Sequence, residues 1–133
     1  MIEKLKELLN NSYSPYSNYR VSAIAVMKDG KEFSGVNVEN SSFGASICAE
    51  RSAIISAISA GYTKGDFKEL HVLVGSGKVG TPCFICRQVI SELFDKDCDI
   101  YCYSTNNERV SYKLSNLCPY PFGEDDLKWN ADL

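Results

Sequence analysis

Two short segments decide the interpretation of this chain, Cys48-Ala49-Glu50 and Pro82-Cys83-Phe84-Ile85-Cys86. Their three thiols and one carboxylate predict a metal site with a base beside it. Structural zinc usually takes four protein ligands, whereas catalytic zinc takes three and leaves one position for water. We therefore predict that Cys48, Cys83 and Cys86 hold one zinc ion. Glu50 lies beside a ligand and, if it stays off the metal, is free to move protons.

Both segments are predicted to begin helices. The stretch 48–60 is rich in Ala and Ile and is followed by Gly61, a residue that is common where helices end. Pro82 suits the entrance to another helix, which we expect from about residue 83 to 94. Residues two apart inside a helix point roughly 200° apart, so Cys48 and Glu50 can converge only if Cys48 begins its helix. Two helix N-termini would then face the metal, and their partial positive charge favours thiolates.

The remaining pattern predicts a short helix at residues 2–9 and a mixed five-stranded sheet. Strands are expected at 21–27, 31–39, 70–75, 99–104 and 110–113. The first two are joined across Lys28-Asp29-Gly30, where Asp-Gly is a strong hairpin signal, so they should be antiparallel. The last two are separated by too few residues for the crossover of a parallel pair, so they should also be antiparallel. We therefore predict one domain over residues 1–133, an α/β fold with helices flanking the sheet.

The composition excludes several classes of protein. A net charge of −3 and a pI near 5.1 lack the basic balance of a nucleic-acid-binding domain, so no nucleic acid is expected as a partner. No apolar run approaches the length that spans a bilayer, so no membrane partner is expected. The chain opens with a charged amphipathic segment, which favours a cytoplasmic location.

Two of the other three cysteines, Cys98 and Cys102, are expected to be core residues. Cys98, Ile100 and Cys102 fall on one face of a strand with a period of two, where small buried hydrophobic residues belong. Three cysteines besides the metal ligands are also an odd number, which a secreted disulfide scaffold would not favour.

Two arginines lie next to the predicted ligands. Arg51 is three residues after Cys48 on the same helix face, so its guanidinium could donate to the ligand thiolates as a second shell and offset their negative charge. The alternative is an exposed arginine. Arg87 follows Cys86 directly, and a solvated surface role or a structural ion pair is as compatible with the sequence as a part in the site.

This constellation resembles the zinc-dependent cytidine deaminases, and the likeness covers most of the chain. The matching segments are Tyr16-Ser17, 35–44, 47–53, Pro82-Cys83 to Cys86-Arg87-Gln88, Phe122-Gly123 and Asp126-Leu127. The resemblance implies the small branch that deaminates free nucleosides, uses three cysteines and forms homotetramers. It also implies a three-layer α/β/α sandwich with one Zn²⁺ per subunit. The activity implied is hydrolytic deamination of cytidine or deoxycytidine to uridine or deoxyuridine and ammonia, as in pyrimidine salvage.

The resemblance also assigns roles to individual residues. A zinc hydroxide would attack C4 of the cytosine ring, while Glu50 takes the proton of the zinc-bound water, protonates N3 and delivers a proton to the departing ammonia. Asn37 and Glu39 would share one face of a strand and bind the ribose 3′-hydroxyl, for which an amide and a carboxylate are a suitable pair. The other implied contacts are Tyr19 near the pyrimidine, the Ala49 N–H on the base carbonyl, and Phe43 and Phe122 in a neighbouring subunit's pocket.

Four positions around the site depart from the family pattern. Phe84 and Ile85 stand between the paired cysteines, where small residues are common, and their bulk is expected beside the metal or in the core. Tyr19 stands where phenylalanine is common and adds a hydroxyl, whereas Phe43 stands where tyrosine is frequent and lacks one.

Two other classes of protein fit parts of the sequence. A thiol-disulfide oxidoreductase also places Cys-x-x-Cys at a helix start after a strand, as Cys83 and Cys86 would be, but it leaves Cys48-Ala49-Glu50 unexplained. A non-catalytic zinc module would use Cys98, Cys102 or Cys118 to close a shell of four thiolates. Such a module would bind a partner and turn over no substrate.

Overall fold

A computed structural model describes residues 1–128 and shows a mixed five-stranded sheet with the order β2-β1-β3-β4-β5. The strands are β1 Val21–Met27, β2 Glu32–Val36, β3 Phe67–Val74, β4 Phe94–Tyr103 and β5 Arg109–Lys113. The β1–β2 and β4–β5 pairs are antiparallel, which confirms both predictions. The β1–β3 pair is also antiparallel, and β3 and β4 are parallel. The predicted domain extends to residue 133, and its last five residues lie outside the described part.

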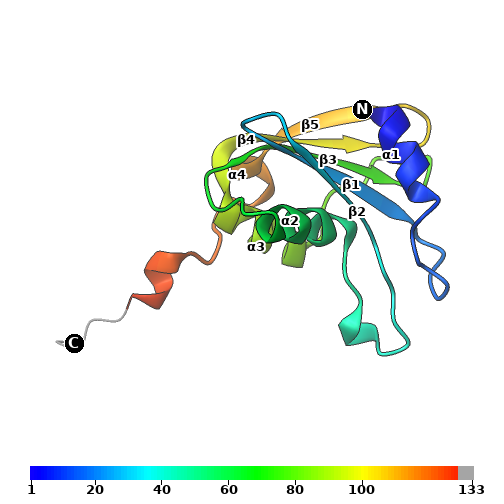
Figure 1. Ribbon diagram of the computed structural model, residues 1–133, viewed down its shortest axis with the longest axis horizontal. Coiled ribbons are helices and arrows are strands. Elements are labelled where there is room, and N and C mark those ends of the chain that lie inside the picture. Colours follow the sequence, from blue (N-terminus) through cyan, green and yellow to red (C-terminus); the bar gives the residue numbers. More distant parts are fainter. Residues whose placement is uncertain (129–133) are drawn as a thin grey trace.

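Helices cover both faces of the sheet, so the expected three layers are present (Figure 1). Helix α1 (Ile2–Leu9) packs alone on one face, against β1, β2 and β3. The other face carries α2 (Ala49–Ser59), α3 (Phe84–Leu93) and the single turn α4 (Leu114–Leu117). Two 3₁₀ turns, η1 (Phe43–Ala45) and η2 (Glu124–Leu127), complete the described chain. Sequence reasoning missed α4 and η2, because elements of one turn carry no periodicity.

Alternation along each strand divides the core between the two faces of the sheet. Ile24 and Val26 point to the α1 side, whereas Ala23 and Ala25 point to the side of α2 and α3. The larger of the two clusters lies on the second side and includes Cys98, Ile100 and Cys102, as predicted from the strand pattern. Helices α2 and α3 therefore lie over the larger of the two clusters.

Gly35 on β2 allows α2 to lie directly on the sheet. A Cβ atom built at Gly35 would be 2.4 Å from the Ala53 nitrogen, 2.7 Å from the Ala49 carbonyl oxygen and 2.8 Å from the Ser52 Cβ. Two of these three contacts are with helix backbone, which cannot rotate away. The close approach fixes the height of α2, and with it the height of Cys48 and Glu50, above the sheet.

The boundaries of three strands differ from the prediction. β2 ends at Val36 instead of residue 39, because its partner β1 begins at Val21 and no longer runs beside it. Beyond that point Val38 pairs with Tyr13 and Ile47 in isolated bridges. β3 and β4 both begin earlier than predicted, at Phe67 and Phe94. Their first halves are rich in charged residues, so their sequences lack the apolar pattern that predicts a strand.

Helix α3 runs into β4 without a loop. Phe94 is both the C-cap of α3 and the first residue of β4, and it is buried against Phe67 with ring centroids 4.7 Å apart. Since β4 is hydrogen-bonded on both sides, the helix that carries Cys86 is attached directly to the interior of the sheet.

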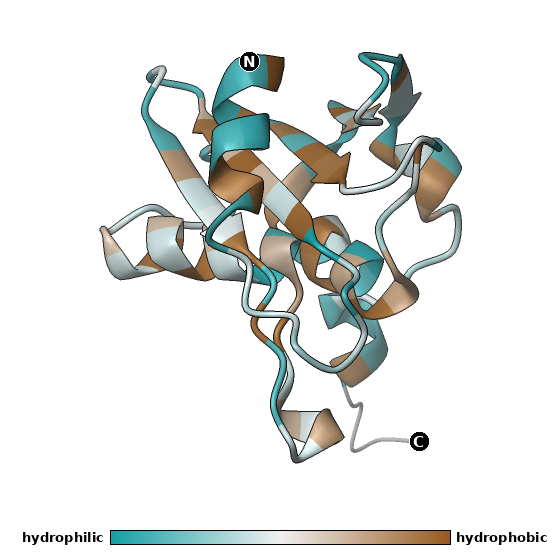
Figure 2. Cartoon of the chain, turned by 90° about the vertical axis from the view of Figure 1, so that its right-hand side faces the viewer, coloured by the Kyte–Doolittle hydropathy of each residue, from teal (hydrophilic) through white to brown (hydrophobic). Residues whose placement is uncertain are grey.

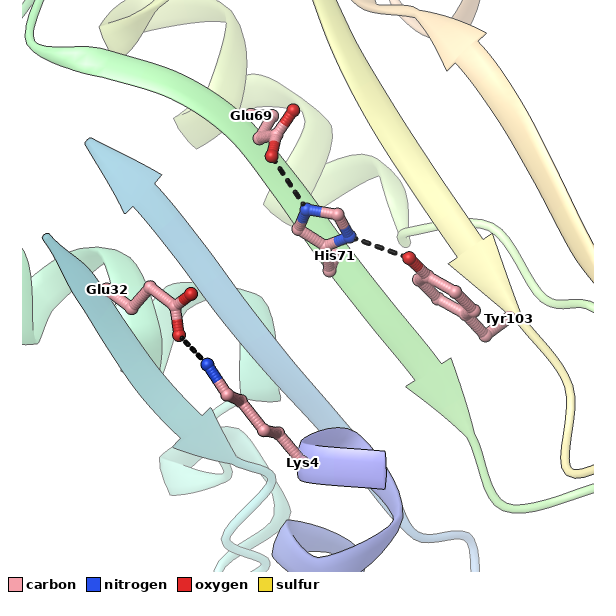
Figure 3. A network of polar contacts seen from close by, with 5 residues as sticks. All are labelled: Lys4, Glu32, Glu69, His71 and Tyr103. Carbon is pink, nitrogen blue, oxygen red and sulfur yellow. Dashed lines mark hydrogen bonds and ion pairs between the residues drawn. The ribbon is translucent and has the colours of Figure 1, made fainter. Parts of the chain in front are cut away.

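His71 is the chain's single histidine, and it is buried on the α1 side of β3 (Figure 3). Its Nδ1 lies 2.8 Å from the Tyr103 hydroxyl and its Nε2 lies 3.1 Å from a Glu69 carboxylate oxygen. Burial lowers the pKa of His71, and a carboxylate only accepts, so the neutral ring carries its proton on Nε2 and accepts from Tyr103 at Nδ1. The ring also stacks on Tyr101 at 4.7 Å. With its ring held on this face, His71 supplies no imidazole to the cysteines.

The loop that carries η1 projects away from the sheet and its flanking helices, and its tip is partly apolar in colour (Figure 2). Within residues 1–128, no helix has the length and the apolar character needed to cross a membrane.

Candidate metal centre

The three cysteines converge where the N-termini of α2 and α3 meet. Cys48 is the N-cap of α2, Cys83 is the N-cap of α3, and Cys86 lies one turn into α3. Their sulfur atoms all lie within 4.8 Å of one another, and Cys48 Sγ and Cys83 Sγ are 3.7 Å apart. Cys48 begins its helix as the convergence argument required, and Glu50 follows in the first turn.

These distances fit a tetrahedral zinc ion. A tetrahedron with Zn–S bonds of about 2.3 Å places its sulfur atoms about 3.8 Å apart. Within residues 1–128, this cluster is the one group of at least three His, Cys, Asp or Glu side chains whose ligand atoms are close enough to share a metal. Cys98, Cys102 and Cys118 do not belong to it, so the structure offers no fourth thiolate from them. A shell of three thiolates leaves one position for a ligand from outside the chain.

Arg51 supplies positive charge to the cluster. Its Nη2 lies 3.6 Å from Cys48 Sγ, so it is not the exposed arginine that we considered as the alternative. A hydrogen bond with Cys86, together with Arg51, lowers the pKa of the Cys48 thiol to about 5. The same contact and burial raise the pKa of Cys86, so Cys48 ionises first. Positive charge and helix N-termini thus favour the thiolate form that a metal requires.

Glu50 is a buried carboxylate beside the cluster. Its side chain is 4% exposed, and burial raises its pKa to about 7, with the nearby Cys48 acting in the same direction. A carboxyl group with a pKa close to neutral can accept and donate protons within one reaction cycle. This is the property that the sequence argument required of Glu50.

A cavity of about 310 Å³ opens onto the cluster. Its lining combines polar groups and sulfur with apolar side chains from β1 and β3. The lining includes Tyr19, Asn37, Glu39, Cys48, Ala49, Glu50 and Cys83, with Val21, Val72 and Val74. Its volume is at the lower end of the range for small-molecule sites, which suits a compact ligand. Apart from the two phenylalanines, every predicted catalytic and substrate-contact residue lines this cavity: Tyr19, Asn37, Glu39, Ala49 and Glu50.

Asn37 and Glu39 lie just beyond β2, and both side chains still reach this cavity. Asn37 accepts from the Val21 N–H at 2.9 Å and donates to the Tyr19 carbonyl oxygen at 2.7 Å. Glu39 accepts from the backbone N–H groups of Tyr16 and Ser17 at 3.0 and 3.1 Å, and the Ser17 hydroxyl also donates to it. These hydrogen bonds lower the pKa of Glu39, and they hold the segment before β1 across the cavity.

Phe43 and Phe122 do not line this cavity within one chain. Phe43 is 77% exposed on η1 and contacts Tyr16 edge-on, and Phe122 is 55% exposed in the segment after α4. The expectation for Phe84 and Ile85 was wrong, because neither lies beside the metal or in the core. They are 74% and 63% exposed, since the first turn of α3 turns Cys86 inward and these two side chains outward.

Sequence reasoning missed two groups that support the site. The hydroxyl of Ser12 donates to Asn37, and Thr81 lines the cavity just before Pro82. Arg87, for which a surface role, an ion pair and a part in the site were all left open, donates to three uncharged oxygens. Asn37 lies 25 residues from Ser12, so the local sequence gives no signal for their contact, and Thr81 was indicated only by its proximity to Cys83.

Removal of one ligand thiol is expected to abolish zinc binding. Cys83→Ala should lower the zinc content from about one ion per chain to near zero, because the two remaining thiolates bind zinc too weakly to retain it. Metal analysis after dialysis measures the content. Cys118→Ala is the matched control and should keep its zinc; loss of metal from Cys118→Ala would favour the four-thiolate module. A reversible Cys83–Cys86 disulfide in a metal-free wild-type protein would favour the oxidoreductase.

Comparison with known proteins gives a consistent set of relatives. Residues 1–102 match the family model described as the cytidine and deoxycytidylate deaminase zinc-binding region. A cytidine deaminase of Halalkalibacterium halodurans is 33% identical over 127 residues, which cover 96% of this chain and 95% of that protein. A probable cytidine deaminase of Dictyostelium discoideum is 37% identical over 136 residues, covering 98% and 90%.

Solved structures agree with the sequence relatives. The crystal structure of cytidine deaminase from Burkholderia pseudomallei matches with a TM-score of 0.87 and 38% identity, covering 91% of this chain and 95% of that chain. The crystal structure of cytidine deaminase from Mycobacterium tuberculosis matches with a TM-score of 0.75 and 31% identity, covering 92% and 97%. The likeness therefore extends over the sheet and over the helices that carry the cysteines.

Proposed function

The chain belongs to the cytidine and deoxycytidylate deaminase family, and from this premise we propose that it is a zinc-dependent cytidine deaminase. It hydrolyses cytidine or deoxycytidine to uridine or deoxyuridine and ammonia. The observation that carries the proposal is the burial of the Glu50 carboxylate in the cavity that opens onto Cys48 and Cys83. An open metal position with a protonatable carboxylate beside it is the arrangement that hydrolytic deamination requires.

Cys48, Cys83 and Cys86 hold the zinc ion as thiolates. When bound, zinc lowers the pKa of a coordinated water so that it becomes a nucleophile near neutral pH. Three thiolates make that water less acidic than neutral imidazoles would. Arg51 moderates this effect, because its guanidinium donates to Cys48 and withdraws charge from the ligand set.

Glu50 moves the protons of the reaction. It takes a proton from the attacking water and gives it to N3 of the cytosine ring. It then takes the proton of the new C4 hydroxyl and delivers it to the departing amino group, which leaves as ammonia. Each transfer needs the same carboxyl group in alternate protonation states. The raised pKa of about 7 supports this role, since both states are then accessible at neutral pH.

The nucleoside binds in the cavity of about 310 Å³ with its base toward the cluster. The Ala49 N–H donates to the base carbonyl oxygen, and Tyr19 packs near the pyrimidine ring. Asn37 and Glu39 bind the ribose 3′-hydroxyl, exchanging some of their present hydrogen bonds for substrate contacts. The acidic net charge supports a free nucleoside as substrate in place of a nucleic acid strand.

The active protein is a homotetramer with shared sites. Phe43 and Phe122 extend from one subunit into the pocket of a neighbour, which accounts for their exposure in a single chain. Exposed Ile55 and Ile58 on α2 offer further apolar area for such an interface. The enzyme acts in the cytoplasm, in pyrimidine salvage, and residues 1–133 form its single catalytic domain.

Turnover of free nucleosides tests the proposed function. Purified protein with one zinc ion per chain should convert cytidine or deoxycytidine with a kcat on the order of 1–10³ s⁻¹. The fall in ultraviolet absorbance on loss of the amino group measures the rate. A single-stranded oligonucleotide that contains cytosine is the control substrate and should not react. Zinc-loaded protein that leaves both nucleosides unchanged would refute the proposal.

A further inference from the structure

Arg87 makes three hydrogen bonds that join two separate segments of the chain. Its Nε donates to the Pro82 carbonyl oxygen at 2.7 Å, and its Nη2 donates to the Thr81 hydroxyl at 2.7 Å. Its Nη1 donates to the Leu117 carbonyl oxygen at 3.0 Å. One guanidinium therefore holds the residues just before Cys83 and the last residue of α4 in a fixed relation.

The segment before Cys83 depends on Arg87 for its position. Residues 79–82 form no helix or strand, and Pro82 has no N–H to donate. Within the described part of the chain, the hydrogen bonds that reach residues 79–82 all come from Arg87. Of the three ligands, Cys83 is the exposed one and Cys86 is buried in α3. Cys48 and Cys83 each accept a bond from their own helix, from the Ser52 and Arg87 N–H groups. They differ on their N-terminal side, because Ile47 before Cys48 is paired with the backbone of Val38, whereas the segment before Cys83 is bonded only to the Arg87 side chain.

The exposed side chain of Phe84 stacks on Arg87. Its ring covers the Arg87 guanidinium, with the guanidinium carbon 4.4 Å from the ring centroid. Stacking of this kind is favourable by itself, and it limits the access of water to the three hydrogen bonds. A small residue at this position would leave that face of the guanidinium uncovered.

We propose that Arg87 is a positioning residue of the metal site, which holds the backbone before Cys83 so that its sulfur stays within coordination distance of the other two. The proposal rests on the zinc site of the proposed function. Arg87 touches neither the metal nor the substrate in this role, because it acts through the Pro82 carbonyl and Thr81. Only the forked guanidinium can reach all three oxygens at once, so lysine is not an equivalent residue.

Gln88 provides a matched control. It follows Arg87 on α3, and its Nε2 donates to the Phe122 carbonyl oxygen at 2.6 Å. Gln88→Met therefore removes a hydrogen bond from α3 to the C-terminal segment without touching residues 79–82. An effect that both Arg87→Met and Gln88→Met show arises from the lost contact between α3 and the C-terminal segment. An effect that only Arg87→Met shows arises from the segment before Cys83.

The test compares wild type, Arg87→Met, Arg87→Lys and Gln88→Met as zinc-loaded and cobalt-substituted proteins. Release of zinc to an excess of chelator should be at least about 10-fold faster in Arg87→Met, the scale of effect known for residues that orient metal ligands. The cobalt absorption bands, which report thiolate geometry, should shift in Arg87→Met and less in Arg87→Lys. Gln88→Met should match wild type in both readouts.

The outcomes separate this inference from the proposed function. Suppose that wild type binds zinc, and that Arg87→Met releases zinc at the wild-type rate and shows the wild-type cobalt bands. This result would overturn the inference about Arg87 and leave the proposed function intact. Wild type that binds no zinc would overturn both. If Arg87→Met does not fold, Arg87→Lys decides, since it keeps the charge and the aliphatic stem; cobalt bands identical to wild type in that variant would also overturn the inference.

Discussion

Glu50→Gln is expected to lower kcat for cytidine by about 10⁴-fold while the protein keeps its zinc. Glutamine has nearly the same shape and can occupy the same buried position, but it cannot take up and release a proton. The proton transfers assigned to Glu50 then have no carrier. Steady-state kinetics and metal analysis on the same preparation measure both parts of the prediction.

Glu92→Gln is the control for this change. Glu92 is exposed on α3, so the same substitution removes one negative charge far from the cavity. It should leave both kcat and zinc content close to wild type. A Glu50→Gln protein that retains its zinc and a substantial part of its kcat would show that another group moves the protons.

Gly35→Ala is expected to lower the free energy of unfolding by about 3 kcal/mol or more. Its added methyl group would stand 2.4 Å from the Ala53 nitrogen and 2.7 Å from the Ala49 oxygen. The backbone of α2 must move away from β2 to make room, and the N-terminal turn with Glu50 moves with it. Unfolding in denaturant measures the loss of stability, and kcat should fall as well.

Gly44→Ala is the matched control, because a Cβ at Gly44 meets no atom within 4 Å in the described chain and its φ is not in the left-handed region. It adds the same methyl group and should leave the free energy of unfolding nearly unchanged. Both variants have to be compared at one protein concentration, since assembly contributes to apparent stability. Equal stability of Gly35→Ala and wild type would mean that α2 does not lie directly on β2.

Much of the fold could be predicted from local signals. Asp29-Gly30 determines the first hairpin, Gly61 follows the end of α2, and Pro82 precedes α3, as the structure confirms. The early parts of β3 and β4 were missed because their extended conformation depends on pairing with remote strands. Charged residues such as Lys68 and Asp95 lie in these strands although their intrinsic strand propensity is low.

The site was predictable where chemistry constrains the residue type. Cys48, Cys83 and Cys86 were predicted to share a metal because Cys48 and Cys83 begin helices and Cys86 lies one turn later. The structure brings their three sulfur atoms together. Arg87 was ambiguous because its three acceptors are backbone and hydroxyl oxygens, which any sequence offers in abundance. The outward direction of Phe84 was also hidden, since it depends on the helical phase that Cys86 imposes.

The direct junction between α3 and β4 at Phe94 leaves the helix of Cys86 without a hinge. Any opening that admits a nucleoside and lets ammonia leave must therefore come from the loops, above all the segment between η1 and Cys48, because Arg87 holds the segment before Cys83. The site thus consists of a rigid part, which keeps the metal ligands in place, and a mobile loop, which controls the entry of substrate and the release of products.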